Sequence, residues 1–422
     1  MGTPRPAGGY LPRVVDAKLR ASLDALGAVL IEGVKACGKT TTARRAARSE
    51  VLLDAEPEAA RKVDLDPRLL LDGRAPRLLD EWQLAPPLWN AVRRAVDDRQ
   101  TAGQFILTGS AIPQHDPRRH SGTGRFGAIA MRTMTLSEQQ AGVPAVSVAG
   151  LLEGAGPTPT NCPLCARDYL RHAAIGGWPA LVGRDERAAR AYLTGYLRSV
   201  VENDISEVSG APRDPRLVRR VLHAYARQLA QPATLAAIVK GAGASTAADA
   251  PSRHTAQTYL DALRLMMIID EVPAWTPLVR SSKRLITTAK RHFADPSLAV
   301  ALLRLTPDRM LDDLRIADRL FDSLAAHDLR VHADAAGAFI YHYREADGRL
   351  AADYLLETHD GELVGVQVRL GEGEIDAAAD SLRRLAARLP RKPRALVVIT
   401  ATSLAHTRPD GVHVVPLGLL GP

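Results

Sequence analysis

The sequence predicts an α/β protein with more than one domain. In the first 140 residues, short apolar runs alternate with helical patterns, and a glycine-rich loop follows the first of these runs. The chain has 422 residues, which is too long for one ordinary core. Its composition, 46% hydrophobic and 24% charged, is typical of a soluble globular protein.

The glycine-rich loop carries the clearest functional signal. The run "LGAVLIEG" is typical of a buried parallel strand, and "TTTARRAARS" after the loop favours a helix. Between them, "GVKACGKT" matches G-x-x-x-x-G-K-[ST], in which backbone N–H groups and a helix N-terminus surround phosphates. Lys39 would reach the β- and γ-phosphates of ATP, and the Thr40 hydroxyl would coordinate Mg2+. The predicted nucleotide-binding residues are Gly33, Val34, Lys35, Ala36, Cys37, Gly38, Lys39, Thr40 and Thr41.

Two further apolar runs end in residues that suit ATP chemistry. "PRLLDEWQ" places Asp80 and Glu81 at the end of a strand, where Asp80 would hold Mg2+ and Glu81 would polarise the attacking water. "GQFILTGSA" ends in Thr108 and Ser110, which would sense the γ-phosphate or the water. Arg125, in "GTGRFG", is either an arginine that stabilises transition-state charge, in its own subunit or a neighbour's, or an ordinary surface arginine.

These motifs give the chain a family resemblance. It resembles prokaryotic AAA-type P-loop ATPases with a C-terminal domain of unknown function and nuclease-like fold. The resemblance rests on "GVKACGKTT", "LLDEWQLAPPLWNAVRRAVDD", "GQFILTGSA", "MRTMTLSE", "YLRHAAIGGWPALV" and "YLRSVVENDISEVSG". It implies an AAA-type domain, binding of ATP and Mg2+, ATP hydrolysis and a cytoplasmic location. It implies no physiological role.

We expect four segments along the chain. Residues 1–145 would form the AAA-type P-loop domain, and residues 146–210 a linker and helical segment. Residues 211–292 would form a winged-helix-like domain, and residues 293–422 an α/β domain resembling restriction endonucleases. In "RAARAYLTGYLRSVVENDISEV", the side chains at 192, 196, 200 and 205 share one helical face and are expected in the core.

The basic charge of the chain is concentrated in its middle. The net charge is +8, and residues 211–290 hold twelve Lys and Arg against five Asp and Glu. A helix, a polar turn, a second helix from about Ser252 and a β-hairpin would form a winged helix, which either contacts DNA or serves as a protein-docking or packing module. Lys290 and Arg291 would lie on or beside the wing, facing phosphates. The candidate DNA-binding residues are Ser252, Arg253, Gln257, Arg280, Lys283 and Arg284.

The C-terminal segment resembles the PD-(D/E)xK nuclease core but departs from its motif. Asp353 matches the first carboxylate, whereas Gln367 and Arg369 replace the acid and the lysine of the second motif, and Asp322 stands for an upstream glutamate. A magnesium site for phosphodiester cleavage needs at least two close anionic ligands, and arginine is too basic to act as a general base. Unless Glu372 or Glu374 moves into the metal site, we expect that this domain does not cleave phosphodiester bonds. We expect instead that it is a scaffold for packing or for binding a protein partner.

Cysteine content points to a reducing compartment. The chain has three cysteines, and the Cys162–Cys165 pair in "NCPLCARDYL" has only His172 nearby as a further zinc ligand. We therefore expect a surface insertion there rather than a zinc site. No apolar run is long enough to span a membrane.

Three functions compete on this evidence. The first is an ATP-hydrolysing switch or motor that contacts DNA or protein, with oligomers possible. The second is a DNA-binding regulator that binds ATP but hardly hydrolyses it. The third, an ATP-dependent nuclease, conflicts with the residues at positions 367 and 369.

Overall fold

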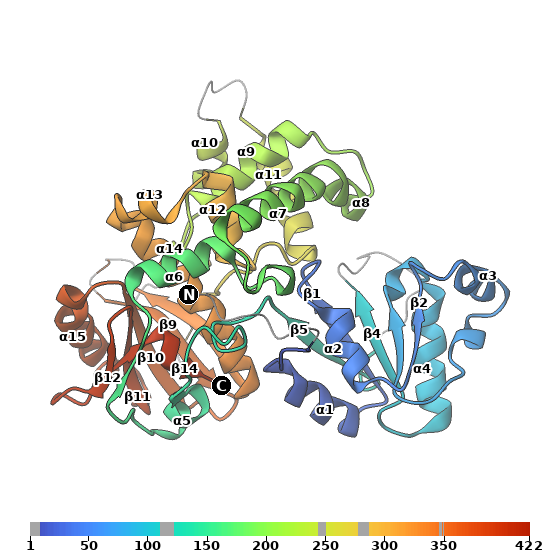
Figure 1. Ribbon diagram of the computed structural model, residues 1–422, viewed down its shortest axis with the longest axis horizontal. Helices are drawn as coiled ribbons and strands as arrows, with labels where there is room; N and C mark the ends of the chain where they lie inside the picture. Colours follow the sequence, from blue (N-terminus) through green and yellow to red (C-terminus); the bar gives the residue numbers. More distant parts are fainter. Residues whose placement is uncertain (1–8, 110–121, 244–249, 277–286, 346–347, 349) are drawn as a thin grey trace.

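The computed structural model describes residues 9–109, 122–243, 250–276, 287–345, 348 and 350–422. Figure 1 shows three parts: an N-terminal sheet domain in blue, a helical part in green and yellow, and a second sheet domain in orange and red. Within the described residues, no helix is long and apolar enough to cross a membrane.

The N-terminal domain is built on a five-stranded sheet with the order β2-β3-β4-β1-β5, and all neighbouring strands are parallel. Its strands are β1 (Ala28–Gly33), β2 (Ser49–Leu52), β3 (Arg77–Asp80), β4 (Phe105–Gly109) and β5 (Phe126–Met131). Its helices are α1 (Val15–Ala25), α2 (Lys39–Ala46), α3 (Pro57–Leu65) and α4 (Pro87–Arg99), with 3₁₀ turns at Pro67–Leu70 and Trp82–Leu84. The α/β prediction is confirmed. Because β1, β3 and β4 are parallel, their carboxyl ends meet at one edge of the sheet.

The helical part contains α6 to α13. Its helices are α6 (Ala166–Ile175), α7 (Glu186–Ser199), α8 (Ile205–Ser209), α9 (Pro215–Ala226), α10 (Leu235–Ala242), α11 (Arg253–Leu265), α12 (Pro296–Leu303) and α13 (Pro307–Leu311), with a 3₁₀ turn at Pro179–Leu181. A π-helical turn, Val200–Asp204, joins α7 to α8. Tyr192 and Tyr196 lie against the buried Trp178, with ring centroids 6.2 and 4.7 Å from the tryptophan. These tyrosines pack against the core, as predicted.

Short antiparallel pairs follow α11. Ile269 pairs with Phe293, and Val272 pairs with Lys290. The second helix of the predicted winged helix begins at Arg253, one residue after Ser252. Most of the polar turn before it and residues 277–286 lie outside the described residues.

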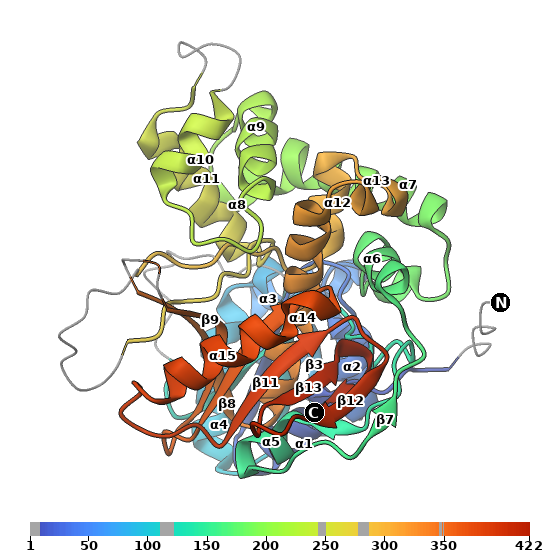
Figure 2. The ribbon, with the colours of Figure 1, turned by 90° about the vertical axis from the view of Figure 1, so that its left-hand side faces the viewer.

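The C-terminal domain holds a seven-stranded mixed sheet with the order β7-β12-β13-β11-β10-β9-β8. Its main elements are α14 (Leu314–Ala335), β8 (Ala338–Arg344), β9 (Ala351–Thr358), β10 (Leu363–Arg369), α15 (Ile375–Ala386), β11 (Ala395–Thr400), β12 (Leu404–Thr407) and β13 (His413–Pro416), with 3₁₀ turns at Glu372–Glu374 and Leu417–Leu419. Strands β8, β9 and β10 form an antiparallel meander, and β11 runs parallel to β10. Alternate residues of β11 face opposite sides of the sheet, and they pack with α14 on one side and with α15 on the other. The two helices therefore cover opposite faces of the sheet, and Figure 2 shows α15 in front of it.

The segment predicted as a linker belongs partly to the C-terminal domain. Strand β6 (Val146–Ser147) pairs with β14 (Leu420–Gly421), and β7 (Thr160–Asn161) pairs with β12. Between them lies α5 (Val148–Glu153). The linker prediction was wrong because the glycines and prolines separate short strands that gain their partners only from the distant chain end.

The predicted surface insertion around Cys162 is likewise corrected. The Cys162 side chain is buried against Ala405 and Leu419, whereas Cys165 is exposed at the start of α6. The Cys162 Sγ lies 3.3 Å from the Tyr169 hydroxyl oxygen. In the described part of the chain, no group of three or more His, Cys, Asp or Glu side chains is arranged to hold a metal ion.

The three parts share their cores. One hydrophobic cluster joins α1 and β1 to helices α6–α12, and another joins Leu136 and β6 to α14 and the C-terminal sheet. Polar contacts cross the same boundaries: Asp270 binds Arg132 of the loop after β5, at 2.6 Å, and Arg330 of α14. Helix α12 packs among α6, α7 and α9, so residues 296–303 belong with the helical part.

Candidate functional site

The glycine-rich loop turns sharply at the carboxyl end of β1. A Cβ atom on Gly33 would lie 2.2 Å from the Met131 carbonyl oxygen of β5, so only glycine fits there. Gly38 has φ +105° and Ala36 has φ +64°, both in the left-handed region that favours glycine. The loop thus runs tightly from β1 into α2, as the motif predicts.

The side chain of Lys39 is folded into this loop. It is 6% exposed, and its Nζ donates hydrogen bonds to the carbonyl oxygens of Gly33, at 2.9 Å, and Val34, at 3.1 Å. Phosphate oxygens are stronger acceptors for an ammonium than neutral carbonyls, because they carry negative charge. The ammonium is therefore held where an incoming phosphate can take over its contacts.

Three oxygen-bearing side chains meet beside the loop. Asp80, at the end of β3, is 5% exposed and accepts hydrogen bonds from Thr40 Oγ1 at 2.9 and 3.2 Å. Thr108 Oγ1 of β4 donates to the same carboxylate. A carboxylate and a hydroxyl are the hard donors that Mg2+ prefers. The residues present therefore fit Mg2+, which Thr40 and Asp80 would hold.

Glu81 follows Asp80 in a strained conformation. Its φ is +53°, which is uncommon for a residue other than glycine, and its carboxylate accepts a hydrogen bond from Gln83 Nε2. Gln83 in turn lies against Gly109, where an added Cβ would be 2.5 Å from Gln83 Oε1. Gln83 therefore orients the predicted catalytic carboxylate, a role that the sequence did not assign to it.

Arg13 is a site residue that sequence reasoning missed. It is 7% exposed; its Nη1 donates to the Cys37 carbonyl oxygen at 3.0 Å and its Nη2 to the Arg132 carbonyl oxygen at 2.7 Å. Its Nε lies 3.1 Å from Glu138 Oε1. The guanidinium thus braces the loop from outside. No local motif marks it, because its partners lie up to 125 residues away in the sequence.

A cavity of about 300 Å3 adjoins the loop. Gly38, Thr41 and Thr42 form one wall. The opposite wall comes from residues before α1 and after β5 and α6, namely Gly9, Tyr10, Leu11, Arg13, Met134, Pro179, Ala180 and Val182. A mostly apolar cavity with a few polar groups is the usual form of a small-molecule site. Its position beside the phosphate loop suits the base and sugar of a nucleotide.

Arg125 is not placed to act on a nucleotide in its own chain. It precedes Phe126, which is level with Ala28 at the amino end of the sheet, whereas the loop begins at Gly33. Five residues of strand separate these ends by about 17 Å. Its Nε pairs with Asp97 Oδ1 at 2.8 Å. The prediction of an arginine finger within one subunit was wrong; Ser110 lies outside the described residues.

The candidate DNA-binding residues have mixed positions. Arg253 is exposed at the start of α11, while Ser252 Oγ caps that helix by accepting from Thr255 N at 3.0 Å. Gln257 is partly exposed and its Nε2 donates to Asp261 Oδ1 at 2.7 Å, within α11. Arg280, Lys283 and Arg284 lie outside the described residues.

Lys290 and Arg291 were predicted to face phosphates, and both are buried instead. They are 4% and 7% exposed. Arg291 pairs with Glu271, and its Nε donates to the Ala233 carbonyl oxygen at 2.8 Å. These charges satisfy internal carboxylates and carbonyls, because unpaired carboxylates inside the fold would be costly.

The residues at the positions of the nuclease motif lie close to one another and to Lys290. Its Nζ lies 2.6 Å from Asp322 Oδ2 and 3.6 Å from Asp353 Oδ1. Arg369 Nη1 lies 2.7 Å from Asp353 Oδ2, and Arg369 Nη2 donates to Gln367 Oε1 at 2.7 Å. Two cations from the chain itself thus neutralise the two acids.

Burial and these cations set the acids' pKa values. Burial raises the pKa of Asp322 to about 6, against the opposing effect of Lys290. Burial alone would also raise the pKa of Asp353, but the charges of Lys290 and Arg369 lower it. Glu372 and Glu374 are exposed in the 3₁₀ turn after β10, and no metal-binding group of carboxylates forms among the described residues.

Comparison with known proteins divides the chain into three regions. Residues 26–140 match a family model described as an AAA domain. Residues 166–309 and 317–420 match two models described as domains of unknown function, DUF8612 and DUF4143. The loop geometry and the first match define residues 26–140 as an AAA-type P-loop domain.

Two curated proteins are similar in sequence. They are the uncharacterized proteins Mb2031c of Mycobacterium bovis and Rv2008c of Mycobacterium tuberculosis, each 27% identical over 296 residues. The match covers 68% of this chain and only 58% of each relative.

Two solved structures are also similar. A Walker-type ATPase of Pyrococcus abyssi aligns with a TM-score of 0.41 and 17% identity, over 69% of this chain and 94% of that one. The ORC2 protein of Aeropyrum pernix aligns with a TM-score of 0.34 and 14% identity, over 75% and 96%.

Proposed function

We propose that this protein binds ATP with Mg2+ and hydrolyses it to ADP and phosphate. The observation that carries the proposal is the meeting of Lys39, Thr40, Asp80 and Thr108 at the carboxyl edge of one parallel sheet. The cavity of about 300 Å3 beside the loop offers room for the nucleoside.

The residues of the chain divide the work as follows. On binding, the Lys39 ammonium exchanges two loop carbonyls for phosphate oxygens. Thr40 and Asp80 would hold Mg2+, which would neutralise phosphate charge. Glu81, oriented by Gln83, accepts a hydrogen bond from the attacking water and aligns it with the γ-phosphate.

Two substitutions test the proposal with separate readouts. With Lys39→Ala we expect both binding of a fluorescent ATP analogue and phosphate release to be lost, because the other lysine of the loop, Lys35, pairs with Asp204 instead. With Glu81→Gln we expect binding to persist and phosphate release to fall by about 100-fold. The exposed residues of α3 provide matched controls, Lys62→Ala and Glu58→Gln. Unchanged phosphate release in Lys39→Ala would reject this site.

We further propose that nucleotide state is passed to the helical part, as a switch requires. Lys35 of the loop pairs with Asp204 of the π-helical turn at 3.0 Å, and the Tyr196 hydroxyl donates to the Lys35 carbonyl oxygen at 3.4 Å. π-helical turns are frequent at functional sites. A loop that rearranges around phosphates would therefore move against α7.

DNA contact through α11 is a second candidate, favoured by the exposed Arg253 and His254 at the start of that helix. The antiparallel pairs behind α11 support a winged-helix arrangement. Arg253→Glu should weaken binding to a labelled DNA duplex and flatten its salt dependence. Arg309→Glu, exposed on α13, is the control. Equal affinities of the two variants would remove this candidate.

For the C-terminal domain we propose a packing or docking role rather than cleavage. Lys290 and Arg369 support this, because they hold the acids that a metal would need. The expected test result is that purified protein with Mg2+ leaves supercoiled plasmid intact. Nicking that disappears in Asp353→Ala would overturn the proposal.

A further inference from the structure

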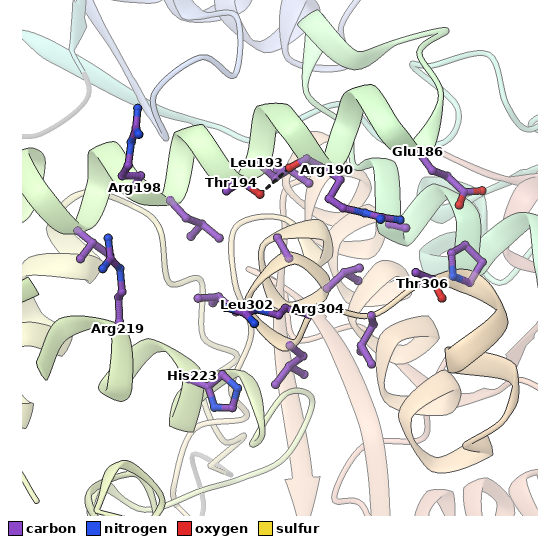
Figure 3. A pocket seen from close by; sticks show the side chains of 18 residues that line it. Glu186, Arg190, Leu193, Thr194, Arg198, Arg219, His223, Leu302, Arg304 and Thr306 are labelled. Carbon is purple, nitrogen blue, oxygen red and sulfur yellow. Dashed lines mark hydrogen bonds between the residues drawn. The ribbon is translucent and has the colours of Figure 1, made fainter. Parts of the chain in front are cut away.

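A long groove of about 860 Å3 crosses the helical part, on the side of α7 away from the phosphate loop (Figure 3). Its walls are α7, α9 and residues 300–307, which lead from α12 into α13. The floor is apolar and comes from Leu193, Leu197, Val201, Val300, Leu302, Leu303 and Leu305. The leucines at 302, 303 and 305 are only partly buried, so the chain leaves apolar surface open here.

The rim of the groove is basic. Arg190 of α7, Arg219 of α9 and Arg304 line it, and all three are exposed. Arg219 pairs with Glu202 at 2.5 Å, but in the described part of the chain no carboxylate pairs with Arg190 or Arg304. Glu186, an acid at one end of the groove, lies 3.6 Å from Arg171. The groove therefore presents uncompensated positive charge beside apolar surface.

Arg304 occupies a position that normally suits glycine. It ends α12 with φ +53°, in the left-handed region. At this position the Arg304 side chain leaves the end of α12 and lines the groove. The opposite wall holds His223, whose pKa is lowered by burial and by two neighbouring arginines. This imidazole therefore adds no charge to the groove near neutral pH.

The dimensions of the groove fit a helix. Its lining residues on this side run from Glu186 of α7 to Val201 of the π-helical turn, and 15 residues of helix rise about 22 Å, or four turns. An amphipathic helix of that length offers an apolar stripe to such a floor. Nucleic acid fits poorly, because its bases would lie against leucines and valines rather than against the polar groups or aromatic rings that bases contact.

We propose that this groove is a docking site for an acidic amphipathic helix of a partner protein. Leucines on the partner's apolar stripe would fill the floor, and flanking glutamates would pair with Arg190 and Arg304. This site is separate from the nucleotide site and does not depend on ATP hydrolysis.

The test uses a fluorescein-labelled peptide of about 18 residues with leucines at helical spacing and glutamates beside them. Its comparators are a scrambled peptide of the same composition, a peptide with glutamine in place of glutamate, and a labelled DNA duplex. Fluorescence anisotropy is measured with the full chain in about 0.1 M salt. We expect the acidic helix to bind more tightly than every comparator.

Variants locate the binding. Arg190→Glu and Arg304→Glu should each weaken it about fivefold to tenfold, and Leu302→Glu by more. Arg187→Glu, exposed on α7 but outside the groove, should leave it unchanged. Circular dichroism shows whether each variant is folded, and the two arginine variants keep the test decisive if Leu302→Glu unfolds. Equal affinity for the scrambled or glutamine peptide, tighter DNA binding, or indifference to the arginine variants would overturn the proposal.

Discussion

The buried ammonium of Lys290 is enclosed by groups that favour its charge. It lies between Asp322 and Asp353 and 4.3 Å from the centre of the Tyr354 ring. The Tyr354 hydroxyl donates to Asp322 as well. A buried charge network of this kind is costly to break from one side, because the remaining charges lose their partner.

Replacing Lys290 by methionine should therefore lower the free energy of unfolding by about 3–5 kcal/mol at neutral pH. The double variant Lys290→Met/Asp322→Asn should recover part of this loss, since one uncompensated carboxylate is gone. Urea unfolding measures both, with the exposed Lys392→Met as the control. If Lys290→Met lowers the free energy of unfolding no more than the control does, the ion pair between Lys290 and Asp322 contributes nothing to stability.

Asp322 should also make stability depend on pH. Burial raises its pKa to about 6 in the folded protein, so the folded state binds this proton more tightly than the unfolded state does. The stabilisation that protonated Asp322 contributes to the folded state is complete below about pH 4 and is lost as the pH rises through 6. Relative to Asp322→Asn, the wild type should lose about 2–3 kcal/mol of stability over this range.

Urea unfolding at several pH values gives this difference directly. The exposed Asp98→Asn, measured at the same pH values, serves as the control. A difference between wild type and Asp322→Asn that is the same at pH 4 and pH 6.5 would contradict the assignment of a raised pKa.

Among the elements, α7 is the one that connects sites. Its residues Tyr192 and Tyr196 pack on Trp178 near the phosphate loop, while Leu193 and Leu197 line the groove. The π-helical turn that follows places Asp204 beside Lys35. Helical periodicity predicts the core face of α7 but not the π-helical turn, which depends on packing against the loop.

Helix α11 gives a prediction at the same scale, because Ser252 has a capping role. Ser252→Ala should lower stability by about 1 kcal/mol and leave DNA affinity unchanged, since the hydroxyl is engaged with Thr255 N. Thermal unfolding and the duplex anisotropy assay measure the two effects. Thr258→Ala, whose hydroxyl bonds within the same helix, is the control. Weaker DNA binding without loss of stability would instead restore Ser252 as a contact residue.

At the scale of the whole molecule, the described parts are joined through shared cores. Asp270 bridges arginines from the N-terminal and C-terminal domains, and Thr133 Oγ1 donates to Asp295 Oδ2 at 2.7 Å. Lys18 of α1 pairs with Asp334 of α14 at 2.6 Å. Domains connected by buried polar groups and common hydrophobic clusters are expected to unfold together.

The tryptophans allow this to be tested. In Trp178→Phe/Trp275→Phe, fluorescence reports on Trp82 and Trp89 of the N-terminal domain. In Trp82→Phe/Trp89→Phe/Trp178→Phe, it reports on Trp275, which packs in the C-terminal domain. Within each variant we expect the fluorescence midpoint to coincide with that of far-UV circular dichroism. Two separated transitions in either variant would show independent domains.

The nucleotide site was predictable because its residues are nearly consecutive. Gly33 to Thr41 lie in one stretch, and a parallel sheet brings the ends of neighbouring strands to one edge, which places Asp80 and Thr108 correctly. The strands of the C-terminal meander, β8, β9 and β10, are consecutive in the sequence, so their pairing is also local.

Only the tertiary structure decided which charges are inside. Lys290 and Arg291 belong to a basic stretch that suggests a surface, yet both pair with buried carboxylates. Arg13 contacts the phosphate loop, whereas Arg125 lies at the amino end of the sheet, far from that loop. Both positions depend on how distant parts of the chain pack around the sheet. Local sequence sets propensity and strand order, whereas burial and pairing depend on residues far apart in the chain, which meet only when the three parts pack.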